Sequence, residues 1–129
     1  MKKSEEDARL AAACGANAII VSNHGGRQLD GAPSTISVLP AIADAVGRSL
    51  EVHLDGGIAS GQDVIKALAL GAKGTYIGRS FLYGLGALGE RGVTKCFESI
   101  YKELELTMAF CGITEVGNVD KHILISGTY

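Results

Sequence analysis

The chain has 129 residues, 47% of them hydrophobic and 20% charged, which is the balance of an ordinary soluble domain. Its formal net charge of −2 argues against nucleic acid or an anionic membrane as a partner, because both attract clustered lysine and arginine. No apolar run is long enough to span a bilayer and the acidic start lacks the apolar core of a signal peptide, so we expect a cytoplasmic protein.

Helices and short apolar strands alternate in the first half of the chain. Residues 4–14 predict a helix, which Ser4 can cap and Gly15 can end. Residues 18–22 are apolar and β-branched with little alternation, a pattern typical of a strand buried on both faces. After a glycine-rich turn, Thr35–Val46 predicts a helix with Pro40 in the first turn of its regular part.

The same alternation continues in the second half of the chain. Glu51–Leu54 and residues 75–77 predict strands, and residues 62–70 predict the helix between them. A long helix is expected over about residues 93–110, followed by a partly irregular tail.

The alternation predicts an α/β fold with a parallel sheet. A faint internal repeat supports it, because residues 14–22 resemble residues 70–78: a helix ends at glycine and the chain turns into a buried strand. A doubly wound sheet is the alternative to a barrel, but the G-x-G-x-x-G fingerprint follows none of the three strands. A complete TIM (β/α)8 barrel has eight strands. We therefore expect part of such a barrel, with about three βα units and a final helix.

Three cysteines are present, and neither their number nor their spacing suggests a disulfide or zinc framework. The count is odd and no C-x-x-C pattern occurs. We expect Cys14, Cys96 and Cys111 to be buried thiols in a reducing compartment.

The first candidate site follows the strand at residues 18–22. The imidazole of His24 can take a proton from a substrate hydroxyl, whereas Arg27 offers a planar fork for a carboxylate. The glycines between them let both side chains face one cavity. This pair suits chemistry on a hydroxy acid; in the alternative interpretation, both side chains only bond loop carbonyls and a surface acid such as Asp30.

The second candidate site follows the next two strands. Asp55-Gly56-Gly57 exposes backbone N–H groups, the helix after it adds the positive end of its dipole, and Gly78-Arg79 adds a guanidinium. Two such segments after successive strands indicate a ligand that carries a phosphate, as at the last strands of many barrels. Ordinary turns beside a surface arginine remain the alternative.

Four segments together resemble the FMN-dependent 2-hydroxy-acid dehydrogenase and oxidase family, which includes L-lactate dehydrogenase, glycolate oxidase and mandelate dehydrogenase. The segments are residues 21–31, 54–57, 63–72 and 77–79, of which the His-Gly-Gly-Arg string is the most specific. Residues 28–40 and the ending Gly127-Thr128-Tyr129 look most like bacterial lactate dehydrogenase-type members. The resemblance implies that residues 1–129 are the C-terminal portion of such a barrel domain.

The resemblance implies FMN as cofactor, a small lactate-like 2-hydroxy acid as substrate, and a role for each candidate residue. His24 would be the catalytic base and, with Arg27, would bind the substrate, whose carboxylate Arg27 holds. Ser22 would lie beside the flavin ring and Asp55 would contact the ribityl chain. The phosphate would be held by the glycine turn and the next loop, through Gly56, Gly57, Gly78 and Arg79.

Two departures from the family pattern bear on activity. Ala59 stands where the family usually has a second phosphate-binding arginine. The family's Lys near the flavin ring lies before the matching segment Ser4-Glu5-Glu6-Asp7-Ala8, and neither Lys2 nor Lys3 is in register with it. The N-terminal strands, with the substrate-binding tyrosines and the acid that pairs with the histidine, have no counterpart in the 129 residues.

These departures leave three interpretations. The first is an oxidoreductase that is inactive as this isolated segment and is completed by a missing N-terminal half or by self-association. The second is a non-catalytic remnant or partner module that retains an FMN or phosphate half-site. The third is another phosphate-binding barrel, such as a relative of inosine monophosphate dehydrogenase or an isomerase, against which the His-Gly-Gly-Arg string argues.

Overall fold

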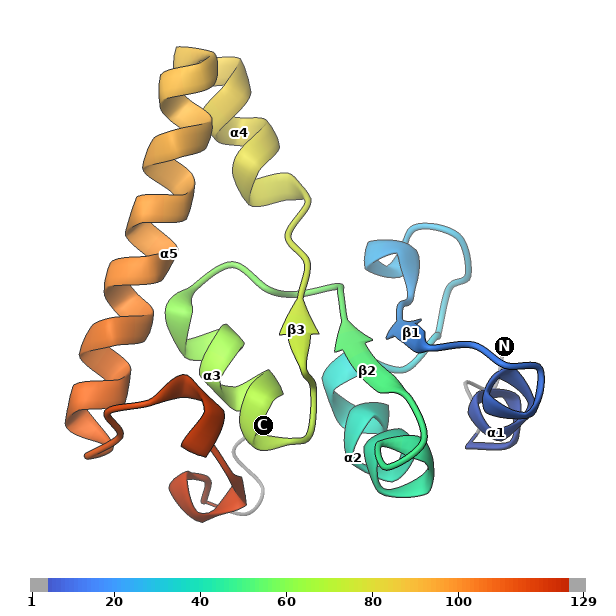
Figure 1. Cartoon of the computed structure of the whole chain (residues 1–129). Helices are drawn as coiled ribbons and strands as arrows, with labels where there is room; N and C mark the ends of the chain where they lie inside the picture. The colour runs from blue at the N-terminus through green and yellow to red at the C-terminus, as the bar shows by residue number, and fades with distance from the viewer. Residues whose placement is uncertain (1–4, 126–129) are drawn as a thin grey trace.

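Three short parallel strands form the centre of the structure, a computed structural model that describes residues 5–125 (Figure 1). The strands are β1 (Ala18–Val21), β2 (Glu51–Leu54) and β3 (Gly74–Thr75), and they lie in the order β1-β2-β3. Val21 is opposite Leu54, and Leu54 is opposite Thr75, so the three strands end at the same edge of the sheet. Because neighbours in the chain are also neighbours in the sheet, the order is that of consecutive barrel strands.

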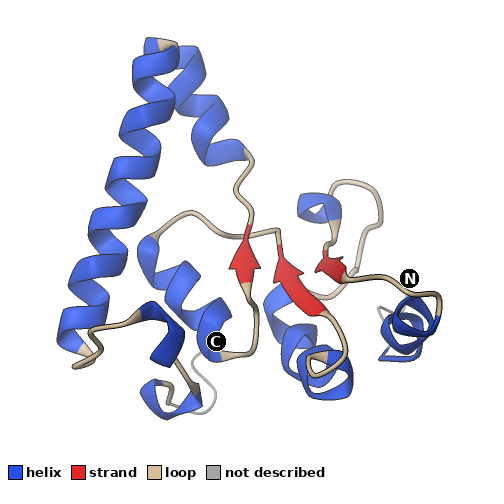
Figure 2. Ribbon diagram, in the orientation of Figure 1, coloured by secondary structure: helices blue, strands red, loops and turns tan. Residues whose placement is uncertain are grey.

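Helices follow each strand and complete the structure, as Figure 2 shows. The expected helices at the beginning, after β1, after β2 and near the end are confirmed, whereas the cap expected at Ser4 lies outside the described residues. The tail is partly irregular, as expected. The helical elements are α1 (Glu5–Ala13), α2 (Thr35–Val46), α3 (Gly61–Ala69), α4 (Arg79–Leu88), α5 (Glu90–Phe110) and the 3-10 turns η1 (His24–Gly26), η2 (Val116–Asn118) and η3 (Lys121–Ile123).

The internal repeat has a common backbone geometry. Gly15 after α1 and Gly71 after α3 have φ angles of 86° and 105°, the left-handed region that glycine adopts without strain. The next N–H in each copy bonds five residues back, from Ala16 to Ala11 at 3.1 Å and from Ala72 to Ala67 at 3.0 Å. Each copy therefore ends its helix in a Schellman motif and enters the next strand in the same direction.

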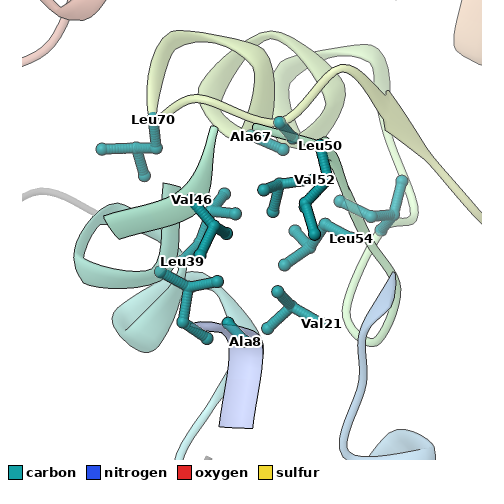
Figure 3. Packing of buried hydrophobic residues seen from close by; sticks show 12 residues of the cluster. Ala8, Val21, Leu39, Val46, Leu50, Val52, Leu54, Ala67 and Leu70 are labelled. Carbon is teal, nitrogen blue, oxygen red and sulfur yellow. The ribbon is translucent and has the colours of Figure 1, made fainter. Parts of the chain in front are cut away.

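The core lies between the sheet and the two helices α2 and α3 (Figure 3). Leu39, Ile42 and Val46 form the buried stripe of α2, at the three- and four-residue spacing of one helical face. Pro40 was expected in the first turn of the regular helix, but it lies inside α2. The burial of Leu39 and Val46 on either side of Pro40 holds the helix continuous although the proline ring removes one backbone hydrogen bond.

Two strand predictions need correction. β1 is not buried on both faces: Val21 is buried, but Ile20 is 52% exposed, because the described helices cover only one face of the sheet. The third strand is Gly74–Thr75, not residues 75–77. The N–H of Tyr76 still bonds Leu54 O at 2.9 Å, but β2 ends there and leaves no ladder for the following residue.

A helix not expected from the sequence, α4, packs against α5 as a projecting hairpin (Figure 1). Gly84 and Gly86 lower its helix propensity, which hides it in the sequence. The two helices approach so closely that a Cβ at Gly84 would collide with the backbone carbonyl of Gly92 on α5. Gly84 is therefore required by packing, and α5 begins at Glu90, three residues before the predicted position.

The burial expected for the cysteines is wrong. Cys14 and Cys111 are exposed and Cys96 is half-buried, and all three thiols are free. Cys14 and Cys111 each follow the last residue of a helix, α1 and α5, where the side chain lies outside the buried face. In the part of the chain that the structure describes, no helix is both long and apolar enough to cross a membrane.

The close approach of α4 and α5 predicts opposite effects for two glycine substitutions in α4. Gly84→Ala should lower the free energy of unfolding by about 1–3 kcal/mol, because the added methyl group must push the two backbones apart. Gly86→Ala is the matched control: its Cβ meets nothing within 4 Å, so it should raise stability by up to about 1 kcal/mol through helix propensity. Urea unfolding at fixed protein concentration measures both, and equal shifts in the same direction would contradict the packing argument.

Candidate functional site

The loops that follow β1, β2 and β3 meet around one cavity of about 530 Å³. Of the residues singled out from the sequence, all except Ser22 line it. Several lining residues had no expected role, among them two tyrosines. The lining consists of His24, Gly25, Arg27, Asp55, Gly56, Gly57, Ile58, Ala59, Tyr76, Gly78, Arg79, Ser80, Leu82 and Tyr83.

The first loop presents His24 and Arg27 in an unusual backbone conformation. His24 has a φ angle of 54°, the only positive value at a non-glycine residue within residues 5–125. This conformation costs an L-residue about 1–3 kcal/mol and is concentrated at functional sites. Gly25 and Gly26 follow with φ angles of 66° and 73°, so three successive residues turn the chain tightly. The turn leaves the side chains of His24 and Arg27 exposed at the cavity.

His24 and Arg27 do not form the contacts of the alternative interpretation, in which both side chains only bond loop carbonyls and a surface acid. Over residues 5–125, no hydrogen bond or ion pair engages either side chain. Asp30, the proposed surface partner, instead accepts the N–H of Gly31 at 3.0 Å. Both functional groups are therefore available to a ligand.

Ser22 does not line the cavity, but its side chain joins the first two loops. Its hydroxyl donates to Asp55 Oδ2 at 2.9 Å and accepts the backbone N–H of His24 at 3.2 Å. The second carboxylate oxygen of Asp55, Oδ1, is buried and has no partner. A buried acceptor without a donor is costly, so this atom is suited to a hydroxyl of a ligand.

Thr35, which sequence reasoning did not assign to the site, fixes the second loop. Its hydroxyl lies 2.6 Å from Asp55 O and 2.9 Å from Gly56 O, and the residue is only 1% exposed. A Cβ at Gly56 would lie 2.7 Å from Asn23 Oδ1, so this glycine is required by close packing as well as by its φ of 81°. The available signal was a hydroxyl residue at the first position of a mostly apolar helix.

The positive end of a helix dipole reaches the cavity from α4, not from α3 as the sequence suggested. At the start of α3, the N–H groups of Ala59 and Ser60 bond Asp63 Oδ2, and that of Gly61 bonds Glu103 Oε2. The first turn of α4 has no side-chain cap at Gly78, so its amides keep the unmatched donors of a helix start. These amides lie beside Gly78 and Arg79, both of which line the cavity.

The cavity therefore has anion-binding groups from two loops, Arg27 after β1 and Arg79 after β3. Arg79 forms no ion pair among the described residues, and a Cβ at Gly25 would lie 3.7 Å from its Nη2, so the first loop and Arg79 are neighbours. Neither Gly57 nor Gly78 has any atom within 4 Å of the place of a Cβ, which leaves open space for a ligand against the backbone. A guanidinium, helix-start amides and open glycines fit a phosphate.

Fold and site together define a segment of an α/β barrel with a cavity at the carboxyl ends of its strands whose lining fits a phosphate. The family model described as FMN-dependent dehydrogenase matches residues 3–126. The chain belongs to the FMN-dependent dehydrogenase family.

The chain is similar to several curated proteins and solved structures. It is 53% identical over 119 residues to an L-lactate dehydrogenase of Caulobacter vibrioides, covering 92% of this chain and 31% of that protein. It is 50% identical to human 2-hydroxyacid oxidase 1, covering 32% of that protein. A structure of mandelate oxidase with 3,3-difluoro-2-hydroxy-3-phenylpropionic acid superposes with a TM-score of 0.88 at 46% identity, covering 92% of this chain and 36% of that chain.

These comparisons confirm three of the sequence-based predictions. The family and the partial-barrel α/β fold are as expected, and FMN is the cofactor of the family. The match also removes the third interpretation, a different phosphate-binding barrel. The chain spans about a third of the length of the curated relatives that it matches, 31% and 32% for the two named above.

The role of Thr35 predicts a specific loss on substitution. Thr35→Val keeps the shape but removes the donor, so the carbonyls of Asp55 and Gly56 lose their buried partner and stability should fall by about 1–3 kcal/mol. Ser37→Ala on the same helix is the control, because that exposed hydroxyl only bonds Ser34 O. Urea unfolding compares the two variants; an equally small effect for both would show that Thr35 does not anchor the turn.

Proposed function

We propose that residues 1–129 form the C-terminal portion of an FMN-dependent oxidoreductase domain that oxidises a small, lactate-like 2-hydroxy acid to the 2-oxo acid. One observation carries the proposal: a single cavity gathers a histidine, a free guanidinium and a second anion-binding end. A hydroxy acid needs a base and a carboxylate clamp, and FMN needs a phosphate site, so the two ends match the two ligands.

The substrate end consists of His24 and Arg27. Arg27 holds the carboxylate through two parallel hydrogen bonds, which fixes the 2-hydroxyl relative to the imidazole. His24 removes the proton of that hydroxyl at a ring nitrogen that no protein group in the described chain occupies. The relatives support this assignment, because their names include lactate and 2-hydroxy-acid enzymes.

The cofactor end consists of Ser22, Asp55, Gly56, Gly57, Gly78 and Arg79. Bound FMN supplies a two-electron acceptor beside the substrate. Asp55 would offer its free Oδ1 to a ribityl hydroxyl, and Ser22, which donates to Asp55 Oδ2, would lie beside the flavin ring. Arg79, the amides of α4 and the open glycines hold the phosphate.

The uncovered face of the sheet fits a polypeptide that supplies further barrel strands. Ile20 on β1 and Tyr76 after β3 are about half exposed, and strands β1 and β3 each have one unpaired edge among residues 5–125. We propose an N-terminal half of the same barrel as the partner, with self-association as the substitute when that half is missing.

Phosphate recognition predicts how FMN affinity responds to two substitutions. Arg79→Ala should weaken FMN binding by about ten- to a hundredfold, because one charge-assisted contact is lost. Ala59→Arg should strengthen binding by a similar factor, because Ala59 is exposed at the cavity and the new guanidinium reaches the same phosphate. Quenching of flavin fluorescence by the purified chain measures both.

Two controls make this test specific for the phosphate. Riboflavin lacks the phosphate, so neither substitution should change its affinity. Ala109→Arg adds the same charge at an exposed position of α5 outside the cavity and should leave FMN binding unchanged. Equal responses for FMN and riboflavin would contradict the assignment of Arg79.

A non-catalytic remnant is the second candidate, and the exposed, unpartnered imidazole of His24 favours it. A remnant retains the loops by descent without having to position a base. FMN binding alone does not distinguish an enzyme segment from a remnant that keeps the cofactor site, whereas turnover in a complete barrel does.

Catalytic competence is predicted for residues 1–129 once they are joined to the N-terminal part of the Caulobacter L-lactate dehydrogenase, whereas the 129 residues alone should show no turnover. In this chimera, His24→Ala should lower kcat about a hundredfold or more with little change in KM, because proton removal occurs only in the transition state. Arg27→Ala should raise KM and lower kcat together, because the carboxylate is held throughout. Lactate oxidation with a dye acceptor measures both, and an unchanged kcat for His24→Ala would end the assignment.

A further inference from the structure

We infer that Ser22 is a positioning residue, whose hydroxyl links the backbone of His24 to the carboxylate of Asp55 and thereby sets the base relative to the flavin half of the cavity. The inference rests on the proposed function and adds to it a residue that acts through two others. It concerns what Ser22 does within the protein, apart from any contact of Ser22 with the flavin ring.

The two hydrogen bonds use the donor and one of the two acceptor lone pairs of one hydroxyl. The proton of Ser22 Oγ points to Asp55 Oδ2 at 2.9 Å, and an oxygen lone pair accepts the N–H of His24 at 3.2 Å. A hydroxyl that donates to a carboxylate becomes a better acceptor, because neighbouring hydrogen bonds polarise one another. The two loops are therefore coupled through a single atom.

His24 needs such a restraint because its backbone is strained. At a φ of 54°, the residue would relax to a right-handed or extended conformation unless its surroundings hold it. Within η1, the remaining backbone bonds are Gly26 N to Asn23 O at 2.9 Å and a long contact from Arg27 N to His24 O at 3.4 Å. Neither involves the N–H of His24, so Ser22 supplies the restraint on that group.

The other end of the link is rigid. Asp55 continues β2, and its N–H bonds Val21 O at 3.1 Å on the neighbouring strand. Its carbonyl lies 2.6 Å from the buried hydroxyl of Thr35. The position of Asp55 is thus fixed by the sheet and by α2, and Ser22 transfers that position to the base-carrying loop. A ligand that occupies the free Oδ1 of Asp55 then lies at a set distance from His24.

Amide hydrogen exchange, read residue by residue by NMR on the 129-residue chain without flavin, tests the link. Ser22→Ala should accelerate exchange at the His24 amide by about five- to tenfold, because one hydrogen bond is lost. Ser22→Thr keeps the hydroxyl and should restore the original rate to within about twofold. The amide of Leu54 inside the sheet serves as the internal reference, and its rate should not change.

The relay itself is tested by combining substitutions. Asp55→Ala removes the acceptor that orients the Ser22 hydroxyl, so it should accelerate exchange at His24 in the native background by several-fold. In the Ser22→Ala background, the same substitution should have no further effect. Ser37→Ala, which removes a serine hydroxyl from α2 outside this network, is the matched control and should leave the His24 amide unchanged.

Three results would overturn the inference: an unchanged His24 rate in Ser22→Ala, equal acceleration at His24 and Leu54, or no recovery in Ser22→Thr. Because these measurements contain no flavin or substrate, they stand independently of the proposed function. If FMN fails to bind while Ser22→Ala still accelerates exchange at the His24 amide, the proposed function fails and the link remains. If FMN binds while Ser22→Ala leaves that exchange rate unchanged, only the link is removed.

Discussion

Parallel pairing of β1 with β2 and of β2 with β3 is the constraint on which the site depends. Val21, Leu54 and Thr75 are aligned across the sheet, so the loops that follow them begin at the same edge. A shift of one residue in the pairing of β1 with β2 would turn every side chain of the shifted strand to the opposite face and separate Ser22 from Asp55. The core residues Val52 and Leu54 prevent this shift, because both are nearly inaccessible to solvent in the correct register. Packing against one face of the sheet thus sets the geometry of the loops at the edge where the three strands end.

The distribution of charge explains why two different anions can occupy one cavity. The start of α3 is satisfied internally, because Asp63 and Glu103 accept its N–H groups, so this helix offers little to a ligand. The start of α4 has no such side chain and lies next to Arg79. Arg27 lies on the loop after β1, also without a partner in the described chain. Guanidinium groups from two loops therefore line one cavity, and a phosphate held by Arg79 would leave Arg27 for a carboxylate.

Most of this arrangement was predictable from the sequence where local pattern and tertiary structure agree. Glu51–Leu54 was predicted to the residue, because the apolar Val52 and Leu54 alternate with polar residues and the segment ends at a turn-forming Asp-Gly-Gly. Helix α4 was missed because its glycines oppose helix formation locally, and one of them, Gly84, is required for a contact with Gly92 that the sequence does not reveal.

The side chains of the site were predictable as a set, but their connections were not. His24, Arg27, Asp55 and Arg79 carry recognisable chemistry, and the cavity brings them together. Thr35 bonds carbonyls 20 and 21 positions away and Ser22 bonds Asp55 33 positions away, relations that no local pattern encodes. The expectation that the start of α3 offers its N–H groups to a ligand was wrong for the same reason. The carboxylate of Glu103, 42 positions along the chain, accepts the N–H of Gly61.

The uncovered face of the sheet has an electrostatic consequence for the site. In bulk water, a guanidinium and a carboxylate 4 Å apart attract by about 1 kcal/mol, whereas at the effective dielectric constant near a protein surface the same pair attracts by about 4 kcal/mol. Arg27 and His24 are exposed in the described chain, so the attraction of Arg27 for a carboxylate lies nearer the smaller value, that of bulk water. Polypeptide that covers the half-exposed Ile20 and Tyr76 would exclude water from the neighbouring cavity. The attraction between Arg27 and a carboxylate would then rise toward the larger value. Such covering strands would strengthen the attraction of Arg27 for a carboxylate without adding a direct contact, and they would do so in the part of the cavity that His24 lines.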